Sequence, residues 1–321
     1  MAKDPIKLRT VFMGTSNFAA VILEDLLGAG YNIVSVYTQE DKKIGRKQEL
    51  QKSAVKMVAE NNKLAVFEPK KFDAEIIAEL KWQKPDLIIV AAYGKILPQE
   101  VLDIPGFGAL CVHPSLLPKF RGPSPIQNAL LENEKETGST IIFMNAGIDS
   151  GDILAQRKTI IEENEIYPGL LSKLAELSSD LMLETLPLWV EQKINPQKQI
   201  DDQATYCQLI ERSDGQIVWA NDAISIHNQY RAFFLWPGIF TFWEKDGLNL
   251  RLKLSKISLD PLSSADDNRK FGQVFKLEDR VAVQTSMGAI ILEEIQLEGK
   301  NNLRIAEFVT GYPEFIGSIL K

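Results

Sequence analysis

Three side chains in this sequence have the chemistry for proton transfer or nucleophilic attack: Cys111, His113 and Asp149. His113 ends an apolar run, Gly108-Ala-Leu-Cys-Val, that has strand character, and Pro114 blocks regular continuation of that strand. We therefore expect His113 to be presented at the strand end and not buried within the strand. Because residues i and i+2 of a strand point to one face, Cys111 should be its neighbour.

Asp149 lies in a tight, glycine-punctuated loop, Asn145-Ala-Gly-Ile-Asp-Ser-Gly-Asp, that follows an apolar strand over residues 140–144. Imidazole and carboxylate side chains can together move a proton and stabilise developing charge. Asp152, in the same loop, is interpreted as a turn former. The second histidine, His227, lies in a helical-looking segment, and we interpret it as a surface or packing residue.

The elements that position these residues alternate between strands and helices. Apolar runs predict strands at residues 8–13, 32–37, 64–67 and 86–92, with helices between them. This order predicts an α/β domain with a mostly parallel sheet, in which ligands bind at the carboxyl ends of the strands. The segment Tyr93-Gly-Lys-Ile-Leu-Pro follows one such strand and should lie beside His113. Gly14 alone is not the three-glycine dinucleotide fingerprint, so a nicotinamide cofactor is not expected.

The length of 321 residues indicates two domains. Helical periodicity lapses after a long helix, in a polar, proline-bearing stretch near Asn195, and short alternating or apolar segments separated by turns follow. These segments predict a small antiparallel barrel. We place the first domain at residues 1–193, a linker at 194–206 and the barrel at 207–321.

Composition excludes several classes of protein. The net charge of −7 argues against nucleic-acid binding over the whole surface, although a local patch remains open. No apolar run reaches the roughly 18 residues that span a bilayer, and the first residues have no signal-peptide core, so we expect a cytoplasmic protein. Two distant cysteines cannot form a disulfide framework, and the histidines and cysteines form no convincing metal site.

The sequence resembles the folate-dependent formyltransferases over nearly its whole length, and among them the members that formylate methionyl initiator tRNA. The motifs that carry the resemblance are specific and occur in order. They are Phe12-Met-Gly-Thr-Ser-Asn-Phe-Ala, Ala92-Tyr-Gly-Lys-Ile-Leu-Pro, His113-Pro-Ser-Leu-Leu-Pro-Lys-Phe-Arg-Gly-Pro-Ser-Pro-Ile-Gln, Gly138-Ser-Thr, Gly147-Ile-Asp-Ser-Gly-Asp, Arg231-Ala-Phe and Trp236-Pro-Gly.

The resemblance implies a Rossmann-like formyltransferase domain followed by a small OB-like β-barrel that binds tRNA. It implies one-carbon transfer from 10-formyltetrahydrofolate, as co-substrate, to methionyl initiator tRNA at the start of translation, by a chain that we expect to be a monomer. It assigns catalysis to His113 and Asp149. The folate would bind at Tyr93, Gly94, Ile96, Leu97, Ser115, Leu116, Leu117 and Pro118. In the polar loop between Thr38 and Gln51, Lys43, Arg46 and Lys47 would contact the tRNA, with Arg46 best suited to a phosphate.

Cys111 departs from the family pattern, which has an asparagine two residues before the histidine, where its amide helps to hold the formyl oxygen. A thiol is a weak donor, and losing one oxyanion donor typically costs about 100- to 1000-fold in turnover. Three alternatives follow: formyl transfer at a reduced rate, activation of the thiol by the imidazole for hydrolysis, or a disabled site in a protein that only binds tRNA or folate.

Related formyltransferases that act on sugars or on glycinamide ribotide, and folate-hydrolysing relatives, share the histidine and aspartate. The polar loop after the second strand, the Arg231 and Trp236 motifs and the final barrel favour methionyl-tRNA as the acceptor. A structural cap on the catalytic domain is the competing interpretation of the barrel.

Overall fold

The computed structural model describes residues 4–44, 49–260 and 269–321. The chain divides into two compact units. The first comprises Met1–Pro125, Lys135–Ile161 and Leu170–Leu209, and the second comprises Ile126–Glu134, Glu162–Gly169 and Ile210–Lys321. Among the described residues, no helix is long and apolar enough to cross a membrane.

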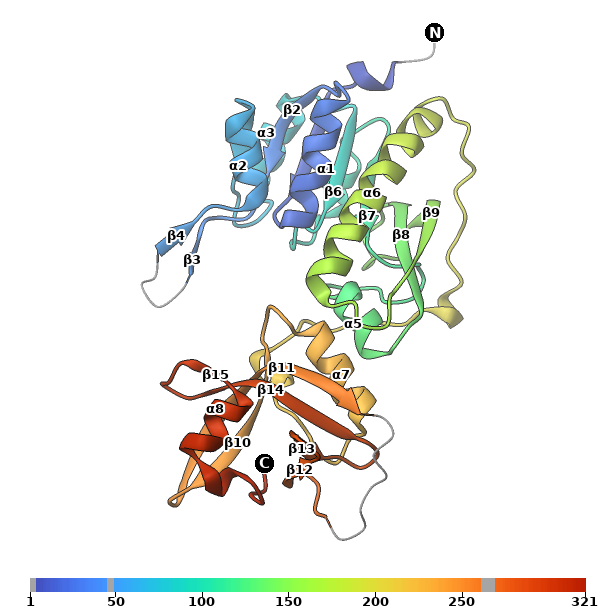
Figure 1. Cartoon of the computed structure of the whole chain (residues 1–321). Helices are drawn as coiled ribbons and strands as arrows, with labels where there is room; N and C mark the ends of the chain where they lie inside the picture. The colour runs from blue at the N-terminus through green and yellow to red at the C-terminus, as the bar shows by residue number, and fades with distance from the viewer. Residues whose placement is uncertain (1–3, 45–48, 261–268) are drawn as a thin grey trace. The chain divides into compact units, whose positions relative to one another are not determined.

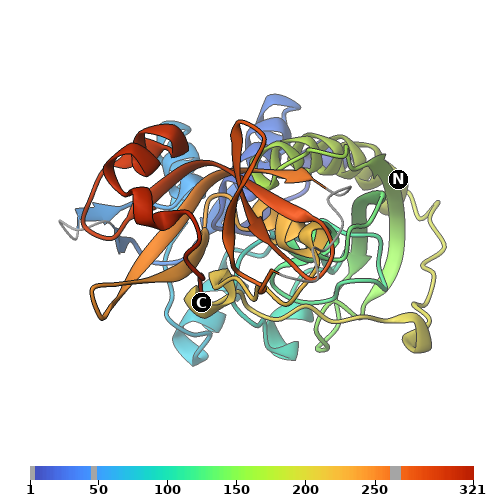
Figure 2. The same ribbon diagram turned by 60° about the horizontal axis from the view of Figure 1, so that its bottom comes forward.

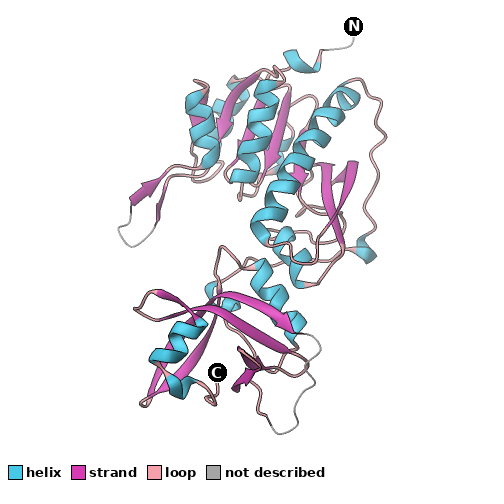
Figure 3. Ribbon diagram, viewed as in Figure 1, coloured by secondary structure: helices cyan, strands magenta, loops and turns pink. Residues whose placement is uncertain are grey.

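A sheet forms the centre of the first unit (Figures 1 and 3), and its strands in the described part of the chain are β1 (Thr10–Gly14), β2 (Ile33–Tyr37), β5 (Ala65–Phe67), β6 (Leu87–Ala91), β7 (Ala109–His113), β8 (Glu136–Phe143) and β9 (Asp152–Ile160). Their order is β5-β2-β1-β6-β7-β8-β9. The first five strands in this order pair in parallel, whereas β8 and β9 are antiparallel to their neighbours. This topology confirms the mostly parallel, Rossmann-like sheet that the sequence predicts.

The helices of the first unit are α1 (Asn17–Gly28), α2 (Ala54–Asn61), α3 (Ala74–Trp82), α4 (Gln99–Leu102) and α6 (Tyr167–Val190), with a short 3₁₀ helix at Pro5–Lys7. Figure 1 shows α1 and α6 in front of the sheet. On the opposite face, Ile77 of α3 and Val101 of α4 pack in one hydrophobic cluster with Met13 and Cys111. Coverage of both faces explains why β6 is a continuous apolar run with every residue buried.

Local sequence signals fix where these elements begin. The hydroxyl of Ser53 accepts a hydrogen bond from the N–H of Lys56 at the start of α2, and the carboxylate of Asp73 caps α3 in the same way. Gly14 ends β1 where a Cβ atom would lie within 2.8 Å of the Ala19 side chain and 2.9 Å of the Ala91 carbonyl oxygen. Gly14 therefore allows close packing of α1 on the sheet.

The stretch from Thr38 to Gln51 differs from the expected polar loop. Part of it forms a two-stranded hairpin, β3 (Lys42–Ile44) and β4 (Glu49–Gln51), in which Lys43 pairs with Leu50. The residues of β4 are exposed, including Leu50 at 68%. The described side chains of these two strands, at Lys42, Lys43 and residues 49–51, are all exposed, so the segment lacks the apolar alternation from which strands are predicted.

In the second unit an antiparallel sheet curls into a half barrel, and its strands in the described part of the chain are β10 (Ile239–Lys245), β11 (Leu248–Asp260), β12 (Val274–Leu277), β13 (Arg280–Gln284), β14 (Ala289–Leu297) and β15 (Asn302–Arg304). The order is β10-β11-β14-β13-β12, with β15 on β14. Register shifts on either side of Lys256 bend β11. The fold confirms the predicted barrel-like domain. The helical elements of the second unit in the described part of the chain are α5 (Pro125–Leu131), which begins at the last residue of the first unit's first segment, α7 (Ala223–Ala232), α8 (Ile305–Gly311) and 3₁₀ turns at Arg212–Gly215 and Pro313–Phe315, whereas the 3₁₀ turn at Asp201–Gln203 belongs to the first unit.

Aromatic side chains join α8 to β10 in the second unit. The ring of Trp243 lies 5.9 Å from that of Phe308 and 5.2 Å from that of Phe315, in edge-to-face arrangements. Figure 2 shows the red helix α8 beside the orange strand β10. The buried Arg231 of α7 donates to the backbone carbonyls of Glu162 and Glu165, which anchors that segment within the unit.

Candidate active site

Parallel pairing of β6 with β7 brings two predicted segments to one edge of the sheet. Ala91 is paired with Val112, so the segment that starts at Tyr93 and the loop that follows His113 leave the sheet at neighbouring points. Tyr93, Leu97, Cys111 and Leu117 are all buried in one hydrophobic cluster. The carboxyl edge is where sheets of this class bind ligands.

His113 is the last residue of β7, as predicted, but its side chain is only 6% exposed. The expectation of a presented ring was therefore wrong, because the loop after the strand folds back over the imidazole. Nε2 lies 2.9 Å from the carbonyl oxygen of Phe120. Since a carbonyl only accepts hydrogen bonds, Nε2 carries a proton in this contact.

Asp149 faces the other ring nitrogen. Its Oδ2 atom lies 3.6 Å from Nδ1 of His113 and accepts a hydrogen bond of 2.8 Å from the backbone N–H of Gly122. The carboxylate is 21% exposed, so it is the more accessible member of the pair. When Nε2 is protonated, an additional proton on Nδ1 or on the carboxylate would make the contact between Nδ1 and Oδ2 attractive. An imidazole and a carboxylate in this arrangement could share or transfer a proton.

The loop that carries Asp149 is held in an uncommon backbone conformation. Asp149 has a φ of 47°, in the left-handed region that favours glycine. The side-chain oxygen of Asn145 accepts hydrogen bonds from the N–H of Gly147 and the hydroxyl of Ser150. Asp152, expected to form the turn, instead begins β9 opposite Phe143. Local hydrogen bonds thus fix where the Asp149 carboxylate points.

Thr140 and Gln156 organise the loop after His113, and the motif analysis gave neither of them a role. The hydroxyl of Thr140 donates to the carbonyl of Ser115 and accepts from the N–H of Leu117. The amide of Gln156 donates to the Leu117 carbonyl at 2.7 Å and to the Thr140 hydroxyl at 2.9 Å. Thr140 belongs to the quoted Gly138-Ser-Thr motif, which was the available signal, whereas Gln156 has none in the sequence.

Cys111 lies on β7 between Val90 and Ile142 of the adjacent strands and is 8% exposed. Burial, followed by the negative charge of Asp149, raises the pKa of the Cys111 thiol well above its usual value. The thiol therefore stays protonated near neutral pH, which disfavours its activation as a nucleophile.

The predicted folate residues include both buried and exposed side chains. Ser115 and Leu117 are buried, Leu116 and Pro118 are half-buried, and Ile96 is 80% exposed. Thr15 and Gln39 hold the backbone of Tyr93, because both side chains donate to its carbonyl. The sequence analysis gave these two residues no role, although Thr15 lies within a quoted motif.

Of the predicted tRNA contacts, only Lys43 lies among the described residues. Lys43 lies on β3 and is exposed. Arg46 and Lys47 lie outside the described residues.

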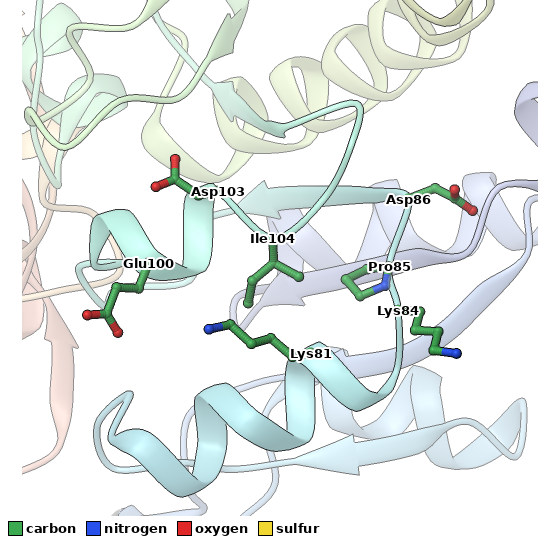
Figure 4. Close-up of a pocket in the computed structure, with 7 residues that line it drawn as sticks. All are labelled: Lys81, Lys84, Pro85, Asp86, Glu100, Asp103 and Ile104. Carbon is green, nitrogen blue, oxygen red and sulfur yellow. The ribbon is translucent and has the colours of Figure 1, made fainter.

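A surface pocket of about 680 Å³ lies at the opposite end of the strands, near the amino end of β6 (Figure 4). Asp86, immediately before β6, contributes to its wall, and none of the predicted site residues that the structure describes does. Its lining mixes both signs of charge and consists of Lys81, Lys84, Pro85, Asp86, Glu100, Asp103 and Ile104.

Comparison with known proteins agrees with this geometry. The formyl transferase family model matches residues 8–186, and the model of the formyl transferase C-terminal domain matches residues 209–313. The methionyl-tRNA formyltransferase of Caldanaerobacter subterraneus subsp. tengcongensis is 40% identical over 98% of this chain and 100% of its own. That of Caldicellulosiruptor saccharolyticus is 41% identical over 97% of this chain and 99% of its own.

Solved structures show the same fold at lower identity. An N-formyltransferase from Helicobacter canadensis has a TM-score of 0.63 and 21% identity, covering 89% of this chain and 98% of its own. The sugar 3N-formyl transferase WlaRD has a TM-score of 0.63 and 19% identity, covering 92% of this chain and 99% of its own. From the full-length sequence matches, the chain belongs to the methionyl-tRNA formyltransferase family of formyl transferases.

Proposed function

We propose that this chain transfers the formyl group of 10-formyltetrahydrofolate to the amino group of methionyl initiator tRNA. The observation that carries the proposal is the buried His113–Asp149 pair, with 3.6 Å between Nδ1 and Oδ2, at the carboxyl edge of a mostly parallel sheet. Full-length identity of 40% to a named methionyl-tRNA formyltransferase supports this acceptor. The Helicobacter canadensis structure was solved with folinic acid, which is consistent with a folate donor.

The reaction needs a neutral amine, a stabilised oxyanion and one proton carried between two nitrogens. The amine nitrogen attacks the formyl carbon, a C–N bond forms, and the carbonyl electron pair moves onto oxygen. When the oxyanion collapses, the bond to the folate nitrogen breaks and that nitrogen takes a proton. Asp149, the more exposed member of the pair, can accept the amine proton directly or through water.

His113 supplies a proton donor. Its Nδ1 faces the Asp149 carboxylate, so an Nδ1–H group would donate to that carboxylate. The Nε2–H group, which donates to the Phe120 carbonyl in this structure, would share that proton with the formyl oxygen or the leaving nitrogen when folate binds. The thiol of Cys111 would be a weaker donor on the same strand, which favours transfer at a reduced rate over a disabled site.

The remaining contacts follow from where the structure places the predicted residues. The backbone from Tyr93 to Leu97, with the loop from Ser115 to Pro118, would hold the folate ring among buried leucines. Lys43 on the exposed hairpin, with Arg46 and Lys47, would contact tRNA phosphates, and the barrel at residues 207–321 would bind the tRNA body. We place catalysis in residues 1–193 and the linker at 194–206. We expect a cytoplasmic protein that is a monomer. A molar mass near 36.0 kDa by light scattering would support the monomer.

Formyl transfer from 10-formyltetrahydrofolate to methionyl initiator tRNA tests the proposal directly. The native sequence should transfer and His113→Ala should not, while both should bind tRNA equally. A free amino sugar offered at the same concentration is the matched control for the acceptor. Transfer to the sugar at an equal rate, or no transfer to the tRNA, would contradict the assignment.

A further inference from the structure

Both proposed catalytic side chains are held by the backbone of one short turn, Phe120–Gly122. The carbonyl oxygen of Phe120 accepts from Nε2 of His113, and the N–H of Gly122 donates to Oδ2 of Asp149. The two bonds come from peptide groups on either side of Arg121. The orientation of these two peptide groups therefore sets how the imidazole and the carboxylate face each other.

This turn does not adopt a relaxed conformation. Phe120 has a φ of 61° and Gly122 a φ of 117°, both in the left-handed half of backbone space. A non-glycine residue such as Phe120 costs on the order of 1 kcal/mol there, so contacts from outside the turn must hold it.

Those contacts come from the segment that leads to the second unit, residues 197–207, which we term the linker strap. The Thr205 hydroxyl accepts a 2.8 Å bond from the N–H of Phe120, and the Thr205 carbonyl accepts a 2.9 Å bond from the N–H of Arg121. The N–H of Cys207 donates to the Arg121 carbonyl at 2.8 Å. The strap thus pairs with the turn as a short parallel strand would.

The other end of the linker strap forms hydrogen bonds with the loop of Asp149 and the start of β9. Gln197 exchanges two backbone hydrogen bonds with Ile153. The side-chain amide of Gln199 donates to the carbonyl of Asp149 at 2.8 Å and to that of Gly151 at 2.7 Å. Gln199 therefore bonds directly to the backbone of the proposed catalytic aspartate.

Arg121 connects these two sets of hydrogen bonds. Its guanidinium, which is almost completely buried, donates through Nε to the side-chain oxygen of Gln199 at 3.0 Å. It also donates to Asp201 at 2.9 Å and to the hydroxyl of Tyr206 at 3.2 Å. Because Arg121 is the central residue of the turn, the turn, the linker strap and the Asp149 loop form one hydrogen-bonded network.

We propose that the linker strap is part of the catalytic apparatus, with Gln199 and Thr205 as positioning residues that fix Asp149 and the Phe120–Gly122 turn relative to His113. This inference rests on the proposed formyl transfer and extends it, because it gives a segment that otherwise only joins two domains a role in setting turnover. Both residues act through others, so their loss should lower kcat while leaving substrate binding intact.

The experiment compares steady-state kinetics of the full chain with Gln199→Leu and Thr205→Val. Gln203→Leu is the matched control for the first change, since Gln203 is an exposed glutamine of the same segment. Thr205→Ser is the matched control for the second, since it keeps the hydroxyl that bonds to Phe120. Misplacement by about 1 Å can cost on the order of 100-fold, so we expect kcat to fall tenfold to about 100-fold in Gln199→Leu and Thr205→Val.

In the two test variants, KM for folate and for methionyl-tRNA should stay within about twofold, and the thermal midpoint should match that of the controls. Thr205→Ser should retain most of the native kcat. Unchanged kcat in both test variants would overturn the inference, as would losses of kcat that merely parallel a lower thermal midpoint and a higher KM. An inactive native chain would instead contradict the proposed function, which separates the two failures.

Discussion

Nδ1 of His113 and Oδ2 of Asp149 lie 3.6 Å apart, although one residue ends β7 and the other lies in the loop between β8 and β9. They meet because β8 runs antiparallel beside β7, with Thr140 paired to His113, and β9 returns beside β8. The parallel strand β7 therefore supplies His113, and the loop between the antiparallel strands β8 and β9 at the edge of the sheet supplies Asp149.

Asp149→Asn tests the charge of this pair with little change in shape. The asparagine oxygen can still accept from the N–H of Gly122, so the loop should keep its conformation. Without the carboxylate, the amine proton loses its acceptor and an imidazolium its partner, and kcat should fall by about 100- to 10,000-fold. Steady-state kinetics with folate KM as the internal control would measure this, and a variant that keeps half of the native kcat would contradict the role.

Cys111→Asn should raise turnover, because an amide donates a better hydrogen bond to an oxyanion than a thiol does. One such donor is worth about 100- to 1000-fold elsewhere, and part of that gain is expected here in kcat, with little change in KM. Cys111→Ala is the control and should remain within severalfold of the native chain. Loss of all activity in Cys111→Ala, or formate release without an acceptor amine, would favour the nucleophilic thiol.

Gly122→Ala should destabilise the first unit as well as slow catalysis. A Cβ atom at Gly122 would lie 2.5 Å from the carbonyl oxygen of Cys207, and its φ of 117° is strained for any other residue. We expect a loss of about 2–4 kcal/mol in the free energy of unfolding by urea. Gly28→Ala is the matched control, because Gly28 lies in α1 with open space around it, and it should be neutral or stabilising.

His227 should make the stability of the second unit depend on pH. Burial, followed by the positive charge of Arg231, lowers the pKa of His227 from 6.5. The folded state therefore favours the neutral ring, so this contribution to stability is present above pH 6.5 and is lost as pH falls through the lower folded pKa.

In His227→Gln, the fall in unfolding free energy between pH 7 and 5 should be shallower than in the native chain. Parallel urea titrations across this range would measure the difference. Identical slopes in the two proteins would contradict a lowered pKa at this position.

The sequence by itself was enough to predict the alternation of strands and helices, since buried parallel strands such as β6 must be apolar throughout. It also placed His113 at a strand end, because Pro114 has no N–H group for a regular ladder. Motifs in the order shared with the formyltransferases identified Asp149 and the family. These are local properties of the chain, because they depend on residue types and on their spacing.

The β3–β4 hairpin was missed because its described side chains are exposed and so leave no apolar pattern. Burial of the His113 ring was missed because the covering turn is held from outside, by Thr205, which bonds to Phe120, and by Gln199, which bonds to Arg121. No residue near His113 signals those partners, since hydrogen bonds between segments distant in sequence leave no periodicity. The sequence thus determined the alternating strands and helices of the first unit and the family motifs, whereas only the tertiary structure decided how the linker strap and the antiparallel strands bring His113 and Asp149 together.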